Sequence, residues 1–97
     1  HVLGMVRQWQ DLFYEKRYSA TVLDDGVDYV KLAEAMGAIG YRATNQEEFR
    51  EVLKKALEAK QPVVIDCIIN CDDKVWPMVA PGEAISSAFT QEDLDNK

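Results

Sequence analysis

Apolar residues near the start of the chain recur every three or four positions, which is the spacing of one face of an α-helix. They are Val2, Met5, Val6, Trp9, Leu12 and Phe13. Residues 4–15 are therefore predicted to form an amphipathic helix. The sequence that follows is mixed and polar, and it ends in a turn signal, Asp24-Asp25-Gly26.

A second helix and a short strand are expected next. Apolar positions at helical spacing continue over residues 27–36, and Gly37 then supplies a C-terminal stop. Ile39 and Tyr41 alternate with smaller or polar residues, so residues 38–43 are predicted to form a strand.

The third helix has the clearest start and stop signals in the sequence. Thr44 and Glu47 have the spacing of a capping box, and Asn45 is the alternative N-cap. Apolar positions within residues 49–57 keep the helical period, and Pro62 follows the end of the pattern.

Residues 63–69, VVIDCII, are nearly all apolar and β-branched. Such a strand is typical of a parallel sheet covered by helices on both faces. The order helix, strand, helix, strand predicts a right-handed crossover unit of an α/β fold. A sheet of two or three strands is small for independent stability. We therefore expect the chain to be a piece of a longer polypeptide, and its apolar start without a Met favours the same interpretation.

The last part of the chain is predicted to be irregular. Pro77 and Pro81 interrupt an apolar stretch, so it cannot form a regular helix and should lie extended across another surface. We expect residues 71–97 to form a C-terminal arm and tail, with one helical turn beginning at Thr90.

Composition narrows the classes of partner. A net charge of −6 argues against nucleic acid, because binding to phosphates needs clustered Lys and Arg. No apolar run approaches the roughly 20 residues that span a bilayer, so no membrane partner is expected.

Cys67 and Cys71 would lie about 13 Å apart along a strand, beyond disulfide reach, and are expected to be reduced thiols of a cytosolic protein. The only His is His1, so no zinc site is predicted.

The residues alone reveal no complete catalytic constellation, phosphate-binding glycine loop or nucleophile motif. The pairs Asp24-Asp25 and Asp72-Asp73 are more typical of solvated turns than of a metal site. Asp66 interrupts an apolar strand, and we interpret it as a structural carboxylate, since a buried one must find donors or a cation. Periodicity alone favours core packing for Met5 and Trp9, which lie one helical turn apart.

A family resemblance adds what periodicity cannot. Residues 3–19, LGMVRQWQDLFYEKRYS, closely resemble a segment of the large catalytic subunit of acetohydroxyacid synthase (acetolactate synthase), a thiamine-diphosphate enzyme. The resemblance continues through VDYVKLAEAMGAIGYRA, PVVIDCIIN and VWPMVAPGEA, in the family's order. It implies that residues 1–97 are the C-terminal part of the thiamine-diphosphate-binding domain, an α/β fold. The lead-in TVLDDGV differs from the family's pattern, which affects only a loop.

The same resemblance implies a cofactor-binding segment. Its residues are His1, Val2, Leu3, Gly4 and Met5, beside the diphosphate. The backbone carbonyl of Val2 matches a ligand of Mg²⁺, a hard ion that accepts carbonyl oxygen and takes most other ligands from phosphate and water. Helix N-terminal amides beside a diphosphate follow the usual anion-binding logic.

The resemblance further implies a substrate pocket formed by Met5, Val6, Trp9, Pro81 and Gly82. In the family the Trp favours 2-ketobutyrate as the second keto acid and contacts herbicidal inhibitors, and Phe13 is expected to support it. Whether Arg7, Gln8 and Arg17 are solvated or lie at a subunit interface stays open.

The reaction implied is that of a transferase in branched-chain amino-acid biosynthesis. It joins two pyruvates to 2-acetolactate, or pyruvate with 2-ketobutyrate to 2-aceto-2-hydroxybutyrate. The resemblance implies thiamine diphosphate, Mg²⁺ and FAD as cofactors, a cytoplasmic homodimer or tetramer, and a regulatory small subunit. The 97 residues alone are expected to be inactive, because the carboxylate that activates the cofactor lies in another domain of the family. The alternatives are another thiamine-diphosphate carboligase or decarboxylase, and a non-catalytic α/β interaction module.

Overall fold

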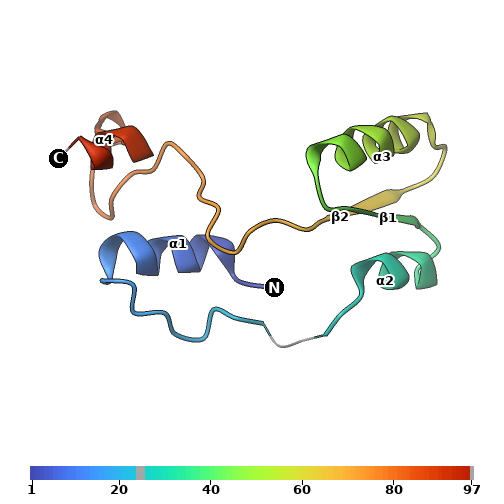
Figure 1. Cartoon of the computed structure of the whole chain (residues 1–97), viewed down its shortest axis with the longest axis horizontal. Helices are drawn as coiled ribbons and strands as arrows, with labels where there is room; N and C mark the ends of the chain where they lie inside the picture. Colours follow the sequence, from blue (N-terminus) through green and yellow to red (C-terminus); the bar gives the residue numbers. More distant parts are fainter. Residues whose placement is uncertain (24–25, 97) are drawn as a thin grey trace. The chain divides into compact units, whose positions relative to one another are not determined.

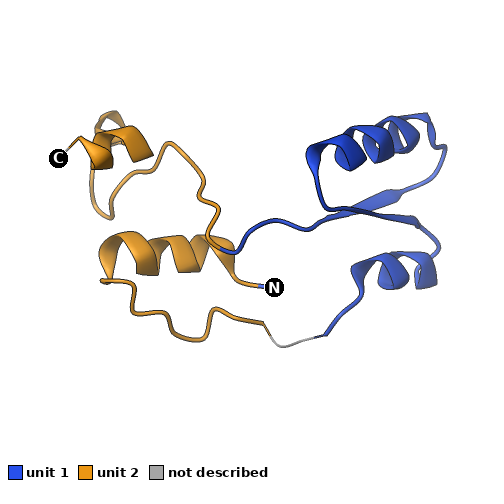
Figure 2. Ribbon diagram, in the orientation of Figure 1, with its two compact units in different colours: residues 1, 24–71 blue, residues 2–23, 72–97 orange. Residues whose placement is uncertain are grey.

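The computed structural model describes residues 1–23 and 26–96, and they form two compact units. Figure 2 colours them separately. Of the described residues, the first unit holds His1 and residues 26–71, and the second holds residues 2–23 and 72–96. The acidic pair Asp24-Asp25, for which a solvated turn was favoured over a metal site, lies outside the described residues. No helix in the described part is long and apolar enough to cross a membrane.

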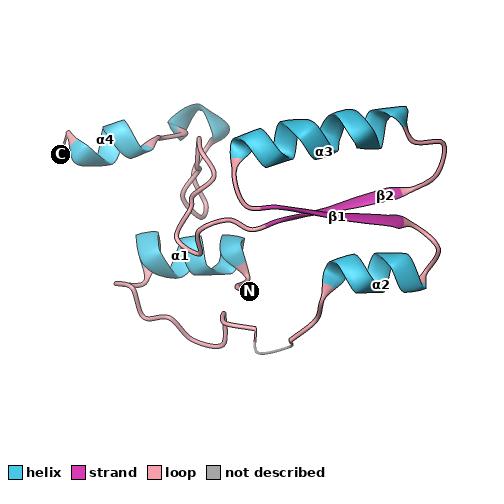
Figure 3. Ribbon diagram, turned by 45° about the vertical axis from the view of Figure 1, so that its right-hand side comes forward, coloured by secondary structure: helices cyan, strands magenta, loops and turns pink. Residues whose placement is uncertain are grey.

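The first unit is the helix–strand crossover that the sequence predicts. Its elements in chain order are α2 (Tyr29–Ala35), β1 (Ile39–Ala43), α3 (Gln46–Glu58) and β2 (Val63–Cys67), labelled in Figure 1. The two strands pair in parallel, with Ile39 opposite Val63 and Ala43 opposite Cys67. Figure 3 shows α2 and α3 on opposite sides of the strands. The α/β fold class is therefore confirmed.

Helix α2 is shorter than its apolar pattern. Asp28 is its N-cap, and the Asp28 carboxylate accepts a hydrogen bond from the Lys31 backbone N–H at 3.2 Å. The helix ends at Ala35, and Gly37 follows with a φ of +83°. The stop predicted at this glycine is therefore confirmed, because only glycine adopts such a backbone without strain.

The cap of α3 differs from the preferred prediction by one residue. Asn45 is the N-cap, and its Oδ1 accepts from the Glu48 N–H at 2.9 Å. Glu48 Oε2 accepts from both the backbone N–H and the hydroxyl of Thr44, each at 2.7 Å. The capping box of Thr44 with Glu47 is thus wrong and the alternative cap is correct. These bonds from Thr44, the backbone one first, lower the pKa of Glu48.

Helix α2 and strand β1 approach at Gly40. A Cβ built there would lie 2.7 Å from the Val30 carbonyl oxygen and 2.9 Å from Val30 Cγ1. Since real Cβ atoms do not approach backbone so closely, only glycine allows this separation of helix and strand. Ala33 and Ala43, both small, are among the buried apolar residues of this unit.

The second unit combines the first helix with the end of the chain. Helix α1 (Gly4–Phe13) ends two residues before the predicted limit, because Glu15 and Lys16 adopt positive φ values of 53° and 59°. The chain then returns along the start of the helix, where Val2 and Val22 form an antiparallel bridge and the Leu3 N–H donates to the Thr21 carbonyl at 2.8 Å.

The arm is irregular, as its prolines predict, and contains two short helices. Met78 and Phe89 pair as an antiparallel bridge and close a loop that holds the 3₁₀ turn η1 (Ile85–Ser87). Helix α4 (Gln91–Asp95) follows, and Asp93 Oδ2 accepts from the Thr90 N–H and hydroxyl at 2.7 and 2.9 Å. The helical turn expected at Thr90 is confirmed.

We expect Gly40→Ala to destabilise the protein by about 1–3 kcal/mol, because the new methyl group forces α2 away from β1. Urea unfolding of the polypeptide that carries this sequence measures the change. Gly4→Ala is the control, since nothing lies within 4 Å of a Cβ built there. Equal stability of the two variants would contradict the close approach.

Candidate functional site on helix α1

A pocket of about 530 Å³ lies along one face of α1 and the turn that follows it. It is lined by Met5, Val6, Trp9, Gln10, Tyr14 and Arg17. Three of the five residues assigned to the substrate pocket by resemblance are therefore together in one cavity. Pro81 and Gly82 are not among its lining residues, and their assignment stays a prediction.

The pocket explains why the apolar stripe of α1 is not simply core. Met5 and Val6 are 47% and 49% exposed, although periodicity alone favours burial for such positions. Sequence reasoning also missed three lining residues. Gln10 and Tyr14 continue the i, i+4, i+8 row that begins at Val6, so helical spacing could have identified them. Arg17 carries no such signal, because it follows the left-handed turn after the helix.

An aromatic cluster lies beside the pocket. The rings of Trp9 and Phe13 pack edge to face with their centroids 5.5 Å apart. Phe13 meets Phe89 of the arm at 6.4 Å, and Phe89 meets Trp76 at 5.9 Å. The support role expected for Phe13 agrees with this contact, and the arm supplies the two further rings.

Gln8 ties the arm to α1. Its Nε2 donates to the Val75 carbonyl at 2.9 Å, and its Oε1 accepts from the Val75 N–H at 2.8 Å. Gln8 is only 3% exposed, so it is neither solvated nor available at an interface. Gln10 makes the same pair of bonds to Ser19, at 3.0 and 3.3 Å, in a more exposed setting. A polar residue bonded to backbone 67 positions away leaves no signal in the local pattern.

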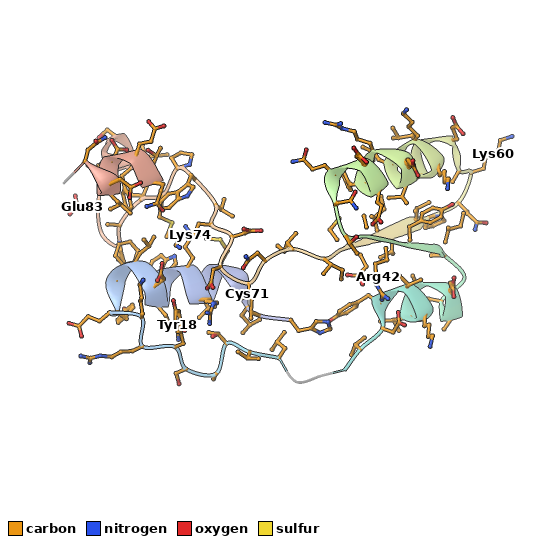
Figure 4. All side chains as sticks on the ribbon, viewed as in Figure 1. Tyr18, Arg42, Lys60, Cys71, Lys74 and Glu83 are labelled. Carbon is orange, nitrogen blue, oxygen red and sulfur yellow. The ribbon has the colours of Figure 1, made fainter. Side chains whose placement is uncertain are left out.

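Charged groups reinforce the same attachment. Asp11 accepts from Lys74 Nζ at 2.9 Å and from the Tyr18 hydroxyl at 3.0 Å. Figure 4 labels Tyr18 on the loop after α1 and Lys74 on the arm. The hydrogen bond from Lys74 lowers the pKa of Asp11, against the opposing effect of desolvation, and the same bond raises the pKa of Lys74.

Arg7 is also held within this unit. Its Nε donates to Asp72 at 2.7 Å, and its guanidinium lies 3.9 Å from the centroid of the Tyr18 ring. Asp72 therefore forms an ion pair that joins the start of the arm to α1. In the described residues, no group of three or more His, Cys, Asp or Glu side chains could hold a metal ion.

The start of α1 has the properties of an anion-binding helix terminus. Leu3 is the N-cap and offers no side-chain hydrogen bond, and the first turn of this helix contains no acidic residue. The first amides of α1 are thus not occupied by a side-chain cap, as binding of a phosphate at a helix N-terminus requires. Val2 can contribute only its backbone oxygen to a metal, so the other ligands must come from elsewhere. His1 belongs to the first unit, where its ring lies 6.1 Å from that of Tyr29.

The carboxylate of Asp66 finds a cation, as expected of a structural residue in an apolar strand. Arg42, its register partner on β1, donates from Nε to Asp66 at 3.0 Å and from Nη2 to Asp28 at 2.9 Å. Arg42 thereby joins both strands to the N-cap of α2. Cys67 and Cys71 are exposed and form no disulfide, in agreement with the prediction.

We expect Gln8→Leu to cost about 1–3 kcal/mol of stability, because it removes both hydrogen bonds that the buried Gln8 amide makes to the part-buried backbone N–H and C=O of Val75. The matched control is Gln10→Leu, which removes the same pair of bonds where water can replace them. Chemical denaturation compares the two variants, and an equal loss in both would show that burial at Gln8 is unimportant.

Asp11→Asn should change how stability depends on pH. Because the folded-state pKa of Asp11 lies below its ordinary value of 3.8, its contribution is complete above about pH 5 and is lost as the pH falls through the folded pKa. The gap in unfolding free energy between wild type and variant should therefore be constant near neutral pH and narrow below about pH 4. A gap that widens on acidification would contradict this assignment. Denaturation at a series of pH values measures it.

Comparisons with known proteins match the resemblance. The family model "Thiamine pyrophosphate enzyme, C-terminal TPP binding domain" matches residues 1–67. The acetolactate synthase large subunit of Mycobacterium tuberculosis is 51% identical over 85 residues, covering 82% of this chain and 14% of that protein. The large subunit of Corynebacterium glutamicum is 48% identical over 89 residues, covering 87% of the chain and 14% of its own length.

A more distant relative is the isozyme 2 large subunit of Escherichia coli, 40% identical over 84 residues, which cover 87% of this chain and 15% of that protein. The chain thus spans about 14% of the length of the curated relatives it matches. The matched family model covers α1, the crossover unit and the uncapped helix start that fits a phosphate. The chain therefore belongs to the thiamine pyrophosphate enzyme family, within its C-terminal TPP-binding domain.

Proposed function

We propose that this chain is the C-terminal part of an acetolactate synthase large subunit. The parent enzyme would condense two pyruvates to 2-acetolactate, or pyruvate with 2-ketobutyrate to 2-aceto-2-hydroxybutyrate. The observation that carries the proposal is the pocket on α1, where Met5, Val6 and Trp9 form an apolar wall on a helix whose N-terminus is uncapped. The identity of 40–51% to acetolactate synthases supports it.

Thiamine diphosphate, when bound, supplies the electron sink for decarboxylation of a 2-keto acid. In this proposal the first amides of α1, from Gly4 and Met5, bind the diphosphate, and the Val2 carbonyl is one Mg²⁺ ligand. His1 and Leu3 flank them in the same segment. The Gly4 position leaves open space, which fits the approach of a cofactor to the backbone. The chain's own contribution is thus to bind and orient the cofactor.

Trp9 then selects the second keto acid. An apolar wall that distinguishes an ethyl group from a methyl group contributes about 1–3 kcal/mol of discrimination. Met5 and Val6 complete this wall. Pro81 and Gly82 would reach the substrate from the arm, in the loop between Met78 and Phe89.

The remaining components belong to the parent enzyme. We propose a cytoplasmic homodimer or tetramer with bound FAD, acting with a regulatory small subunit. The 97 residues contain no carboxylate assigned to activation of the cofactor, so this chain alone would be inactive.

Trp9→Leu in the full-length enzyme should shift product formation from 2-aceto-2-hydroxybutyrate toward 2-acetolactate, because the smaller side chain removes the contact with the ethyl group. Supplying pyruvate and 2-ketobutyrate together and measuring the two products by chromatography tests this. A wild-type enzyme that forms neither product would overturn the proposed function. An active enzyme whose product ratio is unchanged by Trp9→Leu would remove only the role of Trp9.

A further inference from the structure

The aromatic cluster connects the pocket to a residue that does not line it. Trp9 lies in the pocket, Phe13 packs edge-on against Trp9 at an interplanar angle of 72°, and Phe89 packs edge-on against Phe13 at 86°. Edge-to-face contacts are directional, so each ring restricts the orientation of the next. Phe89 is therefore connected to the pocket wall through two ring contacts, from Phe89 to Phe13 and from Phe13 to Trp9.

Phe89 is itself held firmly. Its N–H donates to the Met78 carbonyl and its carbonyl accepts from the Met78 N–H, both at 2.8 Å. Met78 is 7% exposed, and the ring of Trp76 also packs against Phe89, with the ring centroids 5.9 Å apart. The next residue, Thr90, is fixed as the cap of α4. The backbone is thus held at Phe89 by the bridge to Met78 and at Thr90 by the cap of α4. These two attachments give the Phe89 ring a defined position against Phe13.

Trp9 needs such support because its neighbours in the pocket do not provide it. Met5 and Val6 are both about half exposed, and α1 presents them to open space. A tryptophan side chain turns about two torsions, and an indole with one open face keeps its orientation only if its other side is packed. Phe13 provides that packing, and Phe89 keeps Phe13 in place.

We propose that Phe89 is a positioning residue for acceptor selection: acting through Phe13, it holds the Trp9 indole in the orientation that forms the pocket wall. This inference rests on the proposed function, and specifically on the role of Trp9 in preferring 2-ketobutyrate. Phe89 does not contact the substrate in this account. A purely structural role for Phe89 would instead lower activity with both keto acids equally.

The test is a product-ratio assay in the full-length enzyme, with pyruvate and 2-ketobutyrate in competition. Phe89→Leu should lower the ratio of 2-aceto-2-hydroxybutyrate to 2-acetolactate about two- to fivefold, because a leucine fills space without an aromatic edge. Phe89→Tyr keeps the edge and should restore the wild-type ratio. Phe49→Leu, the same change on α3 in the first unit, should leave the ratio unaltered.

A double-mutant cycle separates positioning from a general loss of fold. If Phe89 acts through Trp9, then Trp9→Leu combined with Phe89→Leu should give the ratio of Trp9→Leu alone. A further shift in the double variant would overturn the inference. Where Phe89→Leu fails to fold, Phe13→Leu breaks the same series of contacts from the helix, and an unchanged ratio in that variant overturns it equally.

The same measurements distinguish a failure of the positioning role of Phe89 from a failure of the proposed acetolactate synthase function. A shift in Trp9→Leu with no shift in Phe89→Leu rejects the positioning role and leaves the proposed function intact. A wild-type enzyme that makes neither product rejects the proposed function itself.

Discussion

The second unit depends on a single buried amide. Helix α1 has ten residues, a length that is marginal for an isolated helix in water, and the arm beside it has few backbone hydrogen bonds of its own. Gln8 joins them, because its buried side-chain amide forms hydrogen bonds with both backbone groups of Val75. Once this register is set, Lys74 meets Asp11 and Trp76 meets Phe89. The ion pair and the ring contacts hold the arm to α1 in the same alignment.

In the first unit, the packing of α2 against β1 depends on small residues rather than on polar contacts. The close approach of α2 to β1 requires the absence of a side chain at Gly40, and the small residues Ala33 of α2 and Ala43 of β1 are both buried. Large apolar side chains remain outside: Met36 and Leu57 are 80% and 78% exposed.

Much of this architecture is predictable from local pattern, because helices and strands bury residues at fixed periods. The strand order, the parallel crossover and the glycine stop after α2 all follow from such periods. The cap of α3 was misplaced by one residue, since Thr44 and Asn45 both have the chemistry of a cap and only the backbone angles at Asn45 decide between them. Pattern alone cannot separate these two.

The residues of the candidate site are harder to predict from the spacing of apolar positions than the helices and strands are. Periodicity placed Met5 and Trp9 in a core, whereas they line a pocket, because the same apolar stripe serves either purpose. The roles proposed for them come from the family resemblance. No local signal could identify the backbone partner of Gln8 or the contact of Phe13 with Phe89, because Val75 and Phe89 come from the other end of the chain.

The left-handed turn at Glu15 and Lys16 limits how this sequence can change. Both residues hold a backbone that β-branched side chains strongly disfavour, and Arg17 reaches the pocket directly after them. Drift at these two positions is therefore open to Gly, Asn or Asp and closed to Val, Ile or Thr, whatever their charge or solubility. The border of the pocket thus depends on the backbone shape at Glu15 and Lys16, which restricts both positions to residues that tolerate a positive φ.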